Sequence, residues 1–490
     1  MNRLRQMFAL RANKLGLLAF FLMAALTVLI LSLPRGALST SGHGNPPVST
    51  SASPLKFQAK LSQTKLVQGS DSVVYLDVSI DVPSIENPVV GTAGASDTII
   101  VLDRSGSMAA PNKMPYAKAA IKSLLARLTA EDRFALIAFA DGAELYAPLA
   151  YVDEGTRARL LNLVDQIGAA GGTNLSEGLM LADHLLQNKA PGRSRKVVLL
   201  SDGEANQGII EPARLQTIAK GLVQHQSVLS TIGMGLGFNE TLMASLADYG
   251  MGNYTYLENL AGLDHVLLDD LRQSRQQYAA NSVITLRLHP GVELTDAGGY
   301  PVSTMPDGAL QVSSGQLLAH SQKRLMLSFK LATGTPEEYA LGTIALAYEL
   351  DGESFESALA SEDLTVAVVA AERRDEAIGS IDQEVYRSSW LENNFGLLKR
   401  KLSESIRSGK KEEAKQVLNE YRNAVQAAEV SSSVKIESEA MRDELQVMDR
   451  QIDDVFNAPQ PVQAEKQQRL SKSLQYDGRQ KQRGVTQAAP

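Results

Sequence analysis

The sequence contains no cysteine among its 490 residues, which excludes disulfide bonds, zinc–thiolate sites and cysteine nucleophiles. Its six histidines are scattered, without the spacing of a zinc site. The net charge is −7, and this argues against a dedicated nucleic-acid-binding surface. The Gly-rich lysine motif that holds nucleotide phosphates is also absent. These absences remove thiol, zinc and nucleic-acid-binding functions, so we expect no nucleic-acid partner.

Charge is likewise absent from the segment 15–33, while residues 1–14 are basic and contain no acidic side chain. Nineteen helical residues span about 28 Å, close to the hydrocarbon thickness of about 30 Å. The pattern predicts a single-pass anchor in the inner, cytoplasmic membrane, with residues 1–14 in the cytoplasm and the bulk of the chain periplasmic or extracellular. A signal peptide cleaved near Ala37-Leu38-Ser39, followed by secretion, is the alternative. Residues 34–54 have the composition of a linker.

Two kinds of pattern follow along the chain. Residues 55–95 and 276–371 carry short β-branched stretches with Gly and Pro between them, which predicts strands. Between them, residues 96–275 alternate buried strands with amphipathic helices, which is typical of a doubly wound, Rossmann-like α/β domain. Because the first set of strands is too short to form a stable sheet alone, we expect one β-sandwich with the α/β domain inserted in it.

The last part of the chain is predicted to be helical. Residues 372–456 place apolar side chains at helical spacing, as in Leu391, Phe395, Leu398 and Leu402. The charged stripes of this α-helical region are interpreted either as solvated faces or as surfaces for self-association or partner contact. Residues 457–490 are Gln-rich and lack periodicity, so they predict a disordered tail.

Five oxygen-bearing side chains stand out in the α/β region. The strand 98–102 runs into Asp103, Ser105 and Ser107, and the strand 196–201 runs into Asp202. Thr173 lies in a Gly-Gly-Thr-Asn-Leu turn. Ligands bind at the carboxyl ends of the strands in open α/β sheets, so we expect these side chains to meet there. An oxygen-only set suits a hard divalent cation, Mg²⁺ first, with Ca²⁺ or Mn²⁺ as alternatives.

The order Asp-x-Ser-x-Ser, then a distant Thr, then Asp before Gly resembles the metal-ion-dependent adhesion site of von Willebrand factor A (VWA) domains, over residues 96–275. The resemblance implies that the serines, and sometimes the threonine, contact the ion while the aspartates act through water. It also implies a protein partner that presents an acidic side chain, and binding in place of catalysis. The tracts 171–175 and 231–235 further resemble the A domains of calcium-activated chloride-channel-like proteins.

Other interpretations are weaker. An isolated Asp-x-Ser-x-Ser is more often a capped turn than a metal site. Gly233-x-Gly235-x-Gly237 follows a strand like part of a dinucleotide fingerprint, but Phe238 stands where the third glycine belongs. Glu204 lacks a companion nucleophile or acid, which disfavours a hydrolase. Two functions fit better: a metal-dependent adhesion or assembly protein, or an accessory subunit of an envelope transport or channel complex.

Overall fold

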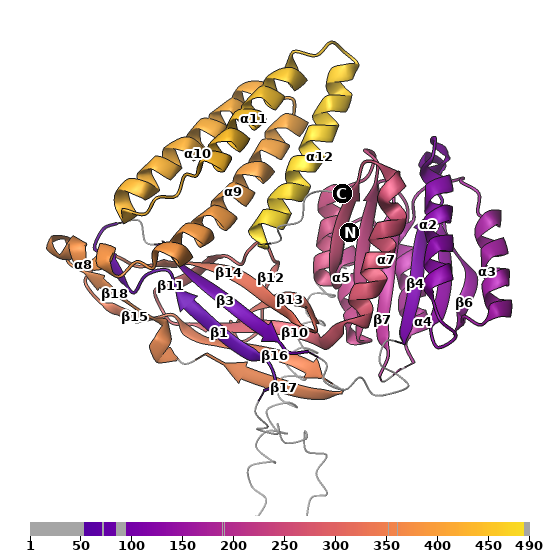
Figure 1. The fold of residues 1–490 in the computed structure, drawn as a ribbon, viewed down its shortest axis with the longest axis horizontal. Coiled ribbons are helices and arrows are strands. Elements are labelled where there is room, and N and C mark those ends of the chain that lie inside the picture. Colours follow the sequence, from indigo (N-terminus) through magenta and orange to yellow (C-terminus); the bar gives the residue numbers. More distant parts are fainter. Residues whose placement is uncertain are drawn as a thin grey trace, which may run out of the picture. The chain divides into compact units, whose positions relative to one another are not determined.

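The structure is a computed structural model that describes residues 53–70, 73–84, 95–188, 190, 192–350, 352–359 and 361–484. They form an α/β domain, a β-sandwich and a helical region (Figure 1). None of the helices in the described part of the chain is both long and apolar enough to cross a membrane. The segment 15–33, where the sequence predicts a membrane-spanning helix, lies outside the described residues.

The α/β domain is built on a six-stranded sheet in the order β6-β5-β4-β7-β8-β9. Its strands are β4 (Ser96–Asp103), β5 (Arg133–Phe139), β6 (Ala143–Tyr151), β7 (Ser194–Ser201), β8 (Ser227–Met234) and β9 (Met251–Leu257). All pairings are parallel except β5 with β6. Every residue of β4 and β8 is buried, as expected for strands covered on both faces.

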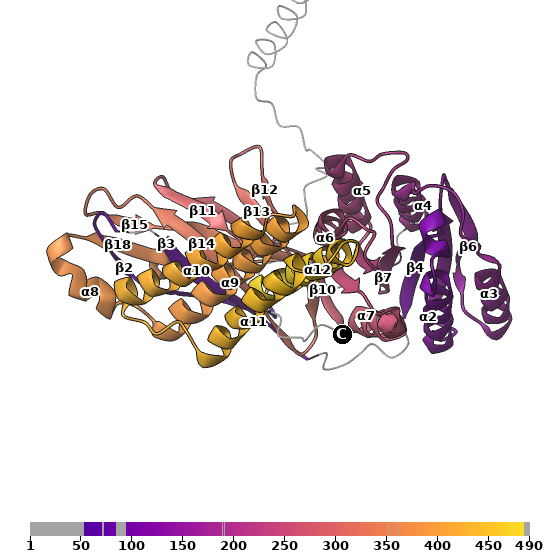
Figure 2. The same cartoon turned by 90° about the horizontal axis from the view of Figure 1, so that it is seen from above.

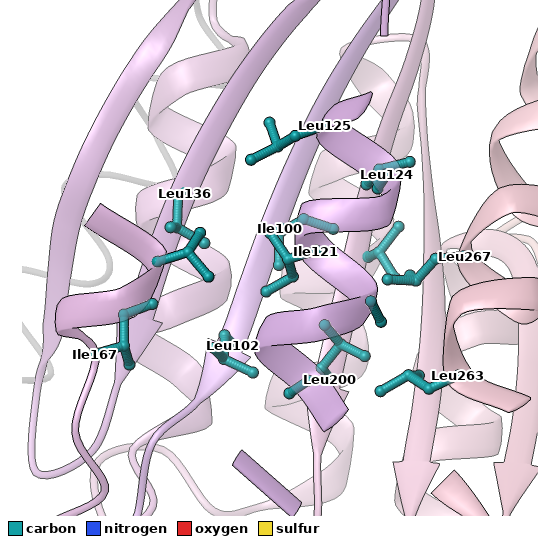
Figure 3. Close-up of a cluster of buried hydrophobic side chains, with 14 of the residues drawn as sticks. Ile100, Leu102, Ile121, Leu124, Leu125, Leu136, Ile167, Leu200, Leu263 and Leu267 are labelled. Atoms are coloured by element: carbon teal, nitrogen blue, oxygen red, sulfur yellow. The ribbon is translucent and has the colours of Figure 1, made fainter. Parts of the chain in front are cut away.

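Helices cover both faces of this sheet. One face carries α2 (Lys113–Arg127), α3 (Glu154–Gln166) and α7 (Leu263–Arg275), and the other carries α4 (Leu175–Leu186), α5 (Pro212–Gln224) and α6 (Glu240–Tyr249) (Figure 2). Successive side chains of β4 point to opposite faces, so Ile100 and Leu102 join the first core while Ile99 and Val101 join the second. Figure 3 shows Ile100 and Leu102 among the leucines of the first core.

Strand β6 was not expected from the sequence. It contains Pro148, and its burial pattern is mostly exposed or intermediate. A proline is tolerated on an edge strand because its missing N–H removes no bond that an inner strand would need. The antiparallel β6 occupies that edge position beside β5.

The β-sandwich combines strands from both sides of the α/β domain, as the sequence predicts. Its first sheet has the order β1 (Lys56–Leu61), β3 (Val73–Val82), β14 (Ser321–Leu331), β11 (Val292–Asp296), and its second has the order β12 (Val302–Thr304), β13 (Leu310–Leu318), β10 (Gln277–Leu288), β16 (Gly342–Leu350), β17 (Glu353–Ala358). A third, small sheet has the order β15 (Glu338–Ala340), β18 (Thr365–Val369), β2 (Lys65–Val67). β3 and β14 pair antiparallel over ten residues. One apolar core includes Leu76 and Leu325 of the first sheet with Ile284 and Leu346 of the second.

The two ends of the inserted α/β domain are fixed to a single turn of the sandwich. The carbonyl of Pro83, after β3, accepts a hydrogen bond from the His320 N–H (3.0 Å), and the carbonyl of Gln276, before β10, accepts one from the Ala319 N–H (2.7 Å). His320 has a positive φ of 56° in this turn between β13 and β14. The insertion therefore begins and ends at neighbouring points.

The helical region extends further along the chain than the sequence predicts. Its helices are α8 (Arg374–Gly379), α9 (Gln383–Arg407), α10 (Lys411–Ser432), α11 (Glu439–Phe456) and α12 (Val462–Gln482). Gly409 separates α9 from α10 with a φ of +71°. α12 lies where the sequence predicts a disordered tail from 457 to 490, so that expectation is wrong for residues 462–482. α12 packs along α9, and Gly396 and Gly478 let their backbones approach closely.

Candidate metal centre

The two predicted aspartates lie at the carboxyl ends of neighbouring strands. Asp103 is the last residue of β4, and Asp202 follows Ser201, the last residue of β7. β4 and β7 are parallel neighbours, while β5, which follows β4 in sequence, lies on the other side of β4. The strand order thus reverses at β4, which is the position where open α/β sheets bind ligands. Both carboxylates are fully buried at this point.

The loop after β4 connects the two carboxylates through its serines. The Ser105 N–H donates to Asp103 Oδ1 at 2.8 Å, and this bond fixes the turn out of the strand. The hydroxyls of Ser105 and Ser107 are hydrogen-bonded at 3.0 Å, and the Ser107 hydroxyl donates to Asp202 Oδ1 at 2.8 Å. A continuous series of hydrogen bonds therefore runs from Asp103, at the end of β4, to Asp202, after β7.

Thr173 joins this group from the turn before α4. Its N–H donates to Asn206 Oδ1 at 2.9 Å, and it is 3% exposed. A Cβ placed on Gly203 would lie 3.3 Å from Thr173 Oγ1, 3.5 Å from Ser107 Oγ and 3.7 Å from Asp103 Oδ2. Three of the predicted oxygens therefore surround one small space, and a side chain at position 203 would intrude on it. The structure thus brings all five predicted residues together.

The donor set fits a hard divalent cation. It consists of two carboxylates and three hydroxyls, with no nitrogen or sulfur ligand. The described residues hold no group of three or more His, Cys, Asp or Glu able to bind a metal ion, and the candidate site here combines two carboxylates with hydroxyls. Two fully buried carboxylates close together also require positive charge nearby.

One ammonium group supplies part of that charge. Lys113 Nζ, in the first turn of α2, donates to Asp202 Oδ2 in a short ion pair. The lysine side chain is 18% exposed and lies beside Gly235, which has a positive φ of 73°. With one ammonium for two carboxylates, the local charge remains negative. Asp202 is thereby held by Ser107 on one oxygen and by Lys113 on the other.

The Asp103 carboxyl has an altered pKa. Burial raises its pKa above the ordinary value, and the neighbouring Asp202 charge adds to this effect. Hydrogen bonds from Ser105 and Ser201 act in the opposite direction. The Ser201 hydroxyl donates to Asp103 Oδ2 at 2.6 Å, so both oxygens of Asp103 accept hydrogen bonds. A bound cation would stabilise the charged form further.

Access to the group is through the loop. Ser107 and Gly106 are exposed, whereas Ser105 is 2% exposed. Beside the loop, Arg104 and Glu144 form an ion pair at 3.7 Å, with Glu144 60% exposed. A ligand can therefore reach the centre from solvent beside Ser107.

Sequence reasoning missed Lys113, Ser201 and the loop after β8. Lys113 stands ten positions after Asp103, in the first turn of the following helix. This position was the one weak indication in the sequence that Lys113 lies near the site. Gly233, Gly235 and Gly237, which do not complete a dinucleotide motif, lie beside this site. A Cβ on Gly237 would lie 3.0 Å from the Asp202 carbonyl oxygen, so this loop packs directly on the backbone of the site.

Comparisons with known proteins agree with this description of the fold. Residues 98–204 match the family model of the von Willebrand factor type A domain. The chain is 30% identical over 181 residues to the uncharacterised protein YfbK of Escherichia coli strain K12, a match that covers 36% of this chain and 31% of that protein. It is 29% identical over 160 residues to inter-alpha-trypsin inhibitor heavy chain 4 of Mus musculus, which covers 31% of this chain and 17% of that protein.

A solved von Willebrand factor type A structure from Catenulispora acidiphila aligns with 86% of this chain and 96% of its own, with a TM-score of 0.62 and 18% identity. The α/β domain is therefore a VWA domain, and the likeness in fold extends to most of the described chain. VWA domains commonly bind other proteins and typically hold a divalent cation at their metal-ion-dependent adhesion site. The chain spans less than a third of the two curated relatives named above, so their activities do not carry over to it.

Proposed function

We propose that this chain binds a partner protein through a divalent cation, Mg²⁺ in the cell, held by Asp103, Ser105, Ser107, Thr173 and Asp202. The observation that carries the proposal is the convergence of these oxygens at the switch point of the VWA sheet. When bound, the ion supplies a coordination position for a carboxylate of the partner. The protein side chains orient the ion and leave its outer side accessible beside the exposed Ser107. No catalytic step is proposed.

Removal of metal provides the direct test. An ion that binds only the native state stabilises it by about 2.7 kcal/mol at a hundred times its Kd. EDTA should therefore lower the melting temperature of the purified protein, and Mg²⁺ or Mn²⁺ should restore it. Ser105→Ala combined with Ser107→Ala should remove this response while the protein stays folded. Thr217→Ala is the matched control, because its hydroxyl bonds to the backbone of its own helix, α5, at Ala213.

Partner capture separates docking from a structural role of the ion. Crosslinking in intact cells should recover a partner with Mg²⁺ present, and much less after chelation or with the double serine variant. Capture that survives the loss of metal binding would show that the ion is structural and that docking uses another surface. Recovery of multi-span membrane proteins alone would favour the accessory-subunit function.

We also propose that the uncharged segment 15–33 tethers the chain to the cytoplasmic membrane with the VWA domain outside. The four basic residues before the segment and none of opposite charge support this orientation. Self-association through the helices of 372–456 stays a prediction.

A further inference from the structure

A buried lysine of the last helix contacts the loop that packs on the metal centre. Lys472, in α12, is 5% exposed, although lysine is among the residues least often buried. Its Nζ donates to the Phe238 carbonyl at 2.7 Å and to Glu240 Oε2 at 2.7 Å. The same ammonium lies 4.0 Å from the centre of the Phe238 ring. Two hydrogen bonds and a cation–π contact therefore fix the β8–α6 loop from one side.

These contacts explain how the charge is tolerated. A buried ammonium is strongly unfavourable unless paired and hydrogen-bonded. Lys472 meets a carboxylate, a carbonyl and an aromatic face, all supplied by the loop 235–239 and the first residue of α6. The ammonium is satisfied only when the loop holds this conformation, so Lys472 specifies that conformation.

The other side of the same loop contacts the metal centre. Gly237 packs on the Asp202 carbonyl, where a Cβ would lie 3.0 Å from the oxygen. The Phe238 ring covers Gly233, where a Cβ would lie 2.2 Å from the ring. Gly233 is paired in register with Ser201, the serine that donates to Asp103. The loop thus lies between the ammonium of α12 and the backbone that carries the metal-centre carboxylates.

α12 has other attachments that do not depend on Lys472. Arg479 and Arg483 both form ion pairs with the buried Asp248 at the end of α6. Gly396 and Gly478 bring α9 and α12 into backbone contact. Removal of the Lys472 charge should therefore free the loop without detaching the helix.

We infer that Lys472 is a positioning residue of the metal centre, acting through the loop 235–239 on Asp202. The inference rests on the proposed function. It makes the affinity for the ion depend on the helical region, which is far from the VWA domain in sequence. The helical region then contributes to metal binding, in addition to any surface that it offers to a partner protein.

The test compares Lys472→Met with Arg469→Met in the full chain. Arg469 lies three residues earlier on α12 and forms an ion pair with Glu258 of the VWA domain, but its side chain is 52% exposed. Mn²⁺ affinity is measured by calorimetry well below the melting temperature. Outer-shell changes at metal sites weaken binding by about ten- to hundredfold, and we expect about tenfold for Lys472→Met and no change for Arg469→Met.

Two further measurements distinguish failure of the inference about Lys472 from failure of the proposed metal site. In Lys472→Met the Glu240 carboxylate still faces Arg407, and the double variant with Glu240→Gln removes this buried carboxylate as well. Weakened Mn²⁺ binding in a double variant whose melting temperature is unchanged without metal supports positioning. Wild-type affinity in Lys472→Met overturns this inference alone. Undiminished Mn²⁺ binding in the Ser105/Ser107 double alanine variant overturns the proposed site itself.

Discussion

The amino end of β4 carries a buried charge cluster that should stabilise the VWA domain without affecting metal binding. Asp97 is fully buried and accepts hydrogen bonds from Arg133 Nε at 2.8 Å and Arg193 Nε at 2.7 Å. Arg195 Nε approaches it at 3.5 Å and is itself 3% exposed. Burial lowers the pKa of the Arg195 guanidinium, and the Asp97 carboxylate partly offsets this by stabilising the charged form.

The perturbation is Asp97→Ala. It leaves Arg195 buried without its counter-charge, and breaking a buried pair in this way costs about 3–5 kcal/mol. At about 2–4 °C per kcal/mol for a domain of this size, the melting temperature should fall by roughly 10 °C. The matched control is Asp165→Ala. Asp165 pairs with Lys122 while 60% exposed, and such a pair contributes at most about 1 kcal/mol.

Thermal and urea unfolding measure this loss of stability. Calorimetry measures the affinity for Mn²⁺, which the substitution should not affect. Asp97 and Asp103 lie at opposite ends of β4, about 20 Å apart at 3.3 Å per residue. The Kd for Mn²⁺ should therefore stay unchanged below the melting temperature. A loss below about 1 kcal/mol, like that of the exposed pair, would refute the argument from burial.

Two other predictions concern acid stability and topology. Burial raises the pKa of Asp132, but hydrogen bonds and the Arg275 charge outweigh it and hold the pKa below the ordinary value. The stabilisation is present above about pH 4 and is lost as pH falls below it, so Asp132→Asn should flatten the acid limb of the unfolding free energy measured from pH 7 downwards. Protease added to spheroplasts should digest the chain beyond residue 35, and protection until lysis would reject the proposed tether.

The buried strands and the positions of the two aspartates at their ends were predictable because they depend on local sequence. Strands covered on both faces must be continuously apolar, and this pattern marks β4 and β7 in the sequence. The short strands that precede the VWA domain needed partners, and β14 supplies them. Because polar residues follow two such strands directly, the positions of Asp103 and Asp202 were predictable as well.

Helix α12 could not be predicted from hydropathy, because its buried positions are mostly polar or small. Ser471, Lys472, Gly478 and Gln482 are buried along with a single large apolar residue, Leu474. Their burial depends on charges and backbone contacts provided by other parts of the chain. A glycine in each of α9 and α12 was the available signal of close helix packing.

The parts of the site that other helices and loops supply could not be predicted from the sequence either. Lys113 reaches Asp202 because α2 starts beside the end of β7, which depends on how the helix packs. The glycines 233, 235 and 237 matched part of a dinucleotide motif by spacing alone. In the structure Gly233 allows close approach to Phe238 and Gly237 to the Asp202 carbonyl, while Gly235 has a positive φ of 73°. Their role follows from contacts between elements, which one sequence does not reveal.

The way the VWA domain is inserted has a consequence for the order of folding. β3 must pair with β14, although their paired residues are 239 (Val82 and Ser321) to 257 (Val73 and Lys330) positions apart. While the insertion is unfolded, this pairing closes a very long loop. Once the VWA domain has folded, its two ends can meet the same turn through Ala319 and His320.

By loop-closure entropy, folding of the VWA domain shortens the effective loop between β3 and β14 from roughly 240 residues to roughly 60, which lowers the free energy of closure by about 1 kcal/mol. The folded VWA domain holds the two flanking segments of the sandwich close together. Its folding should therefore come first and accelerate the pairing of β3 with β14. A substitution that unfolds the VWA domain would accordingly leave β3 as an open edge strand, which is a hazard for aggregation.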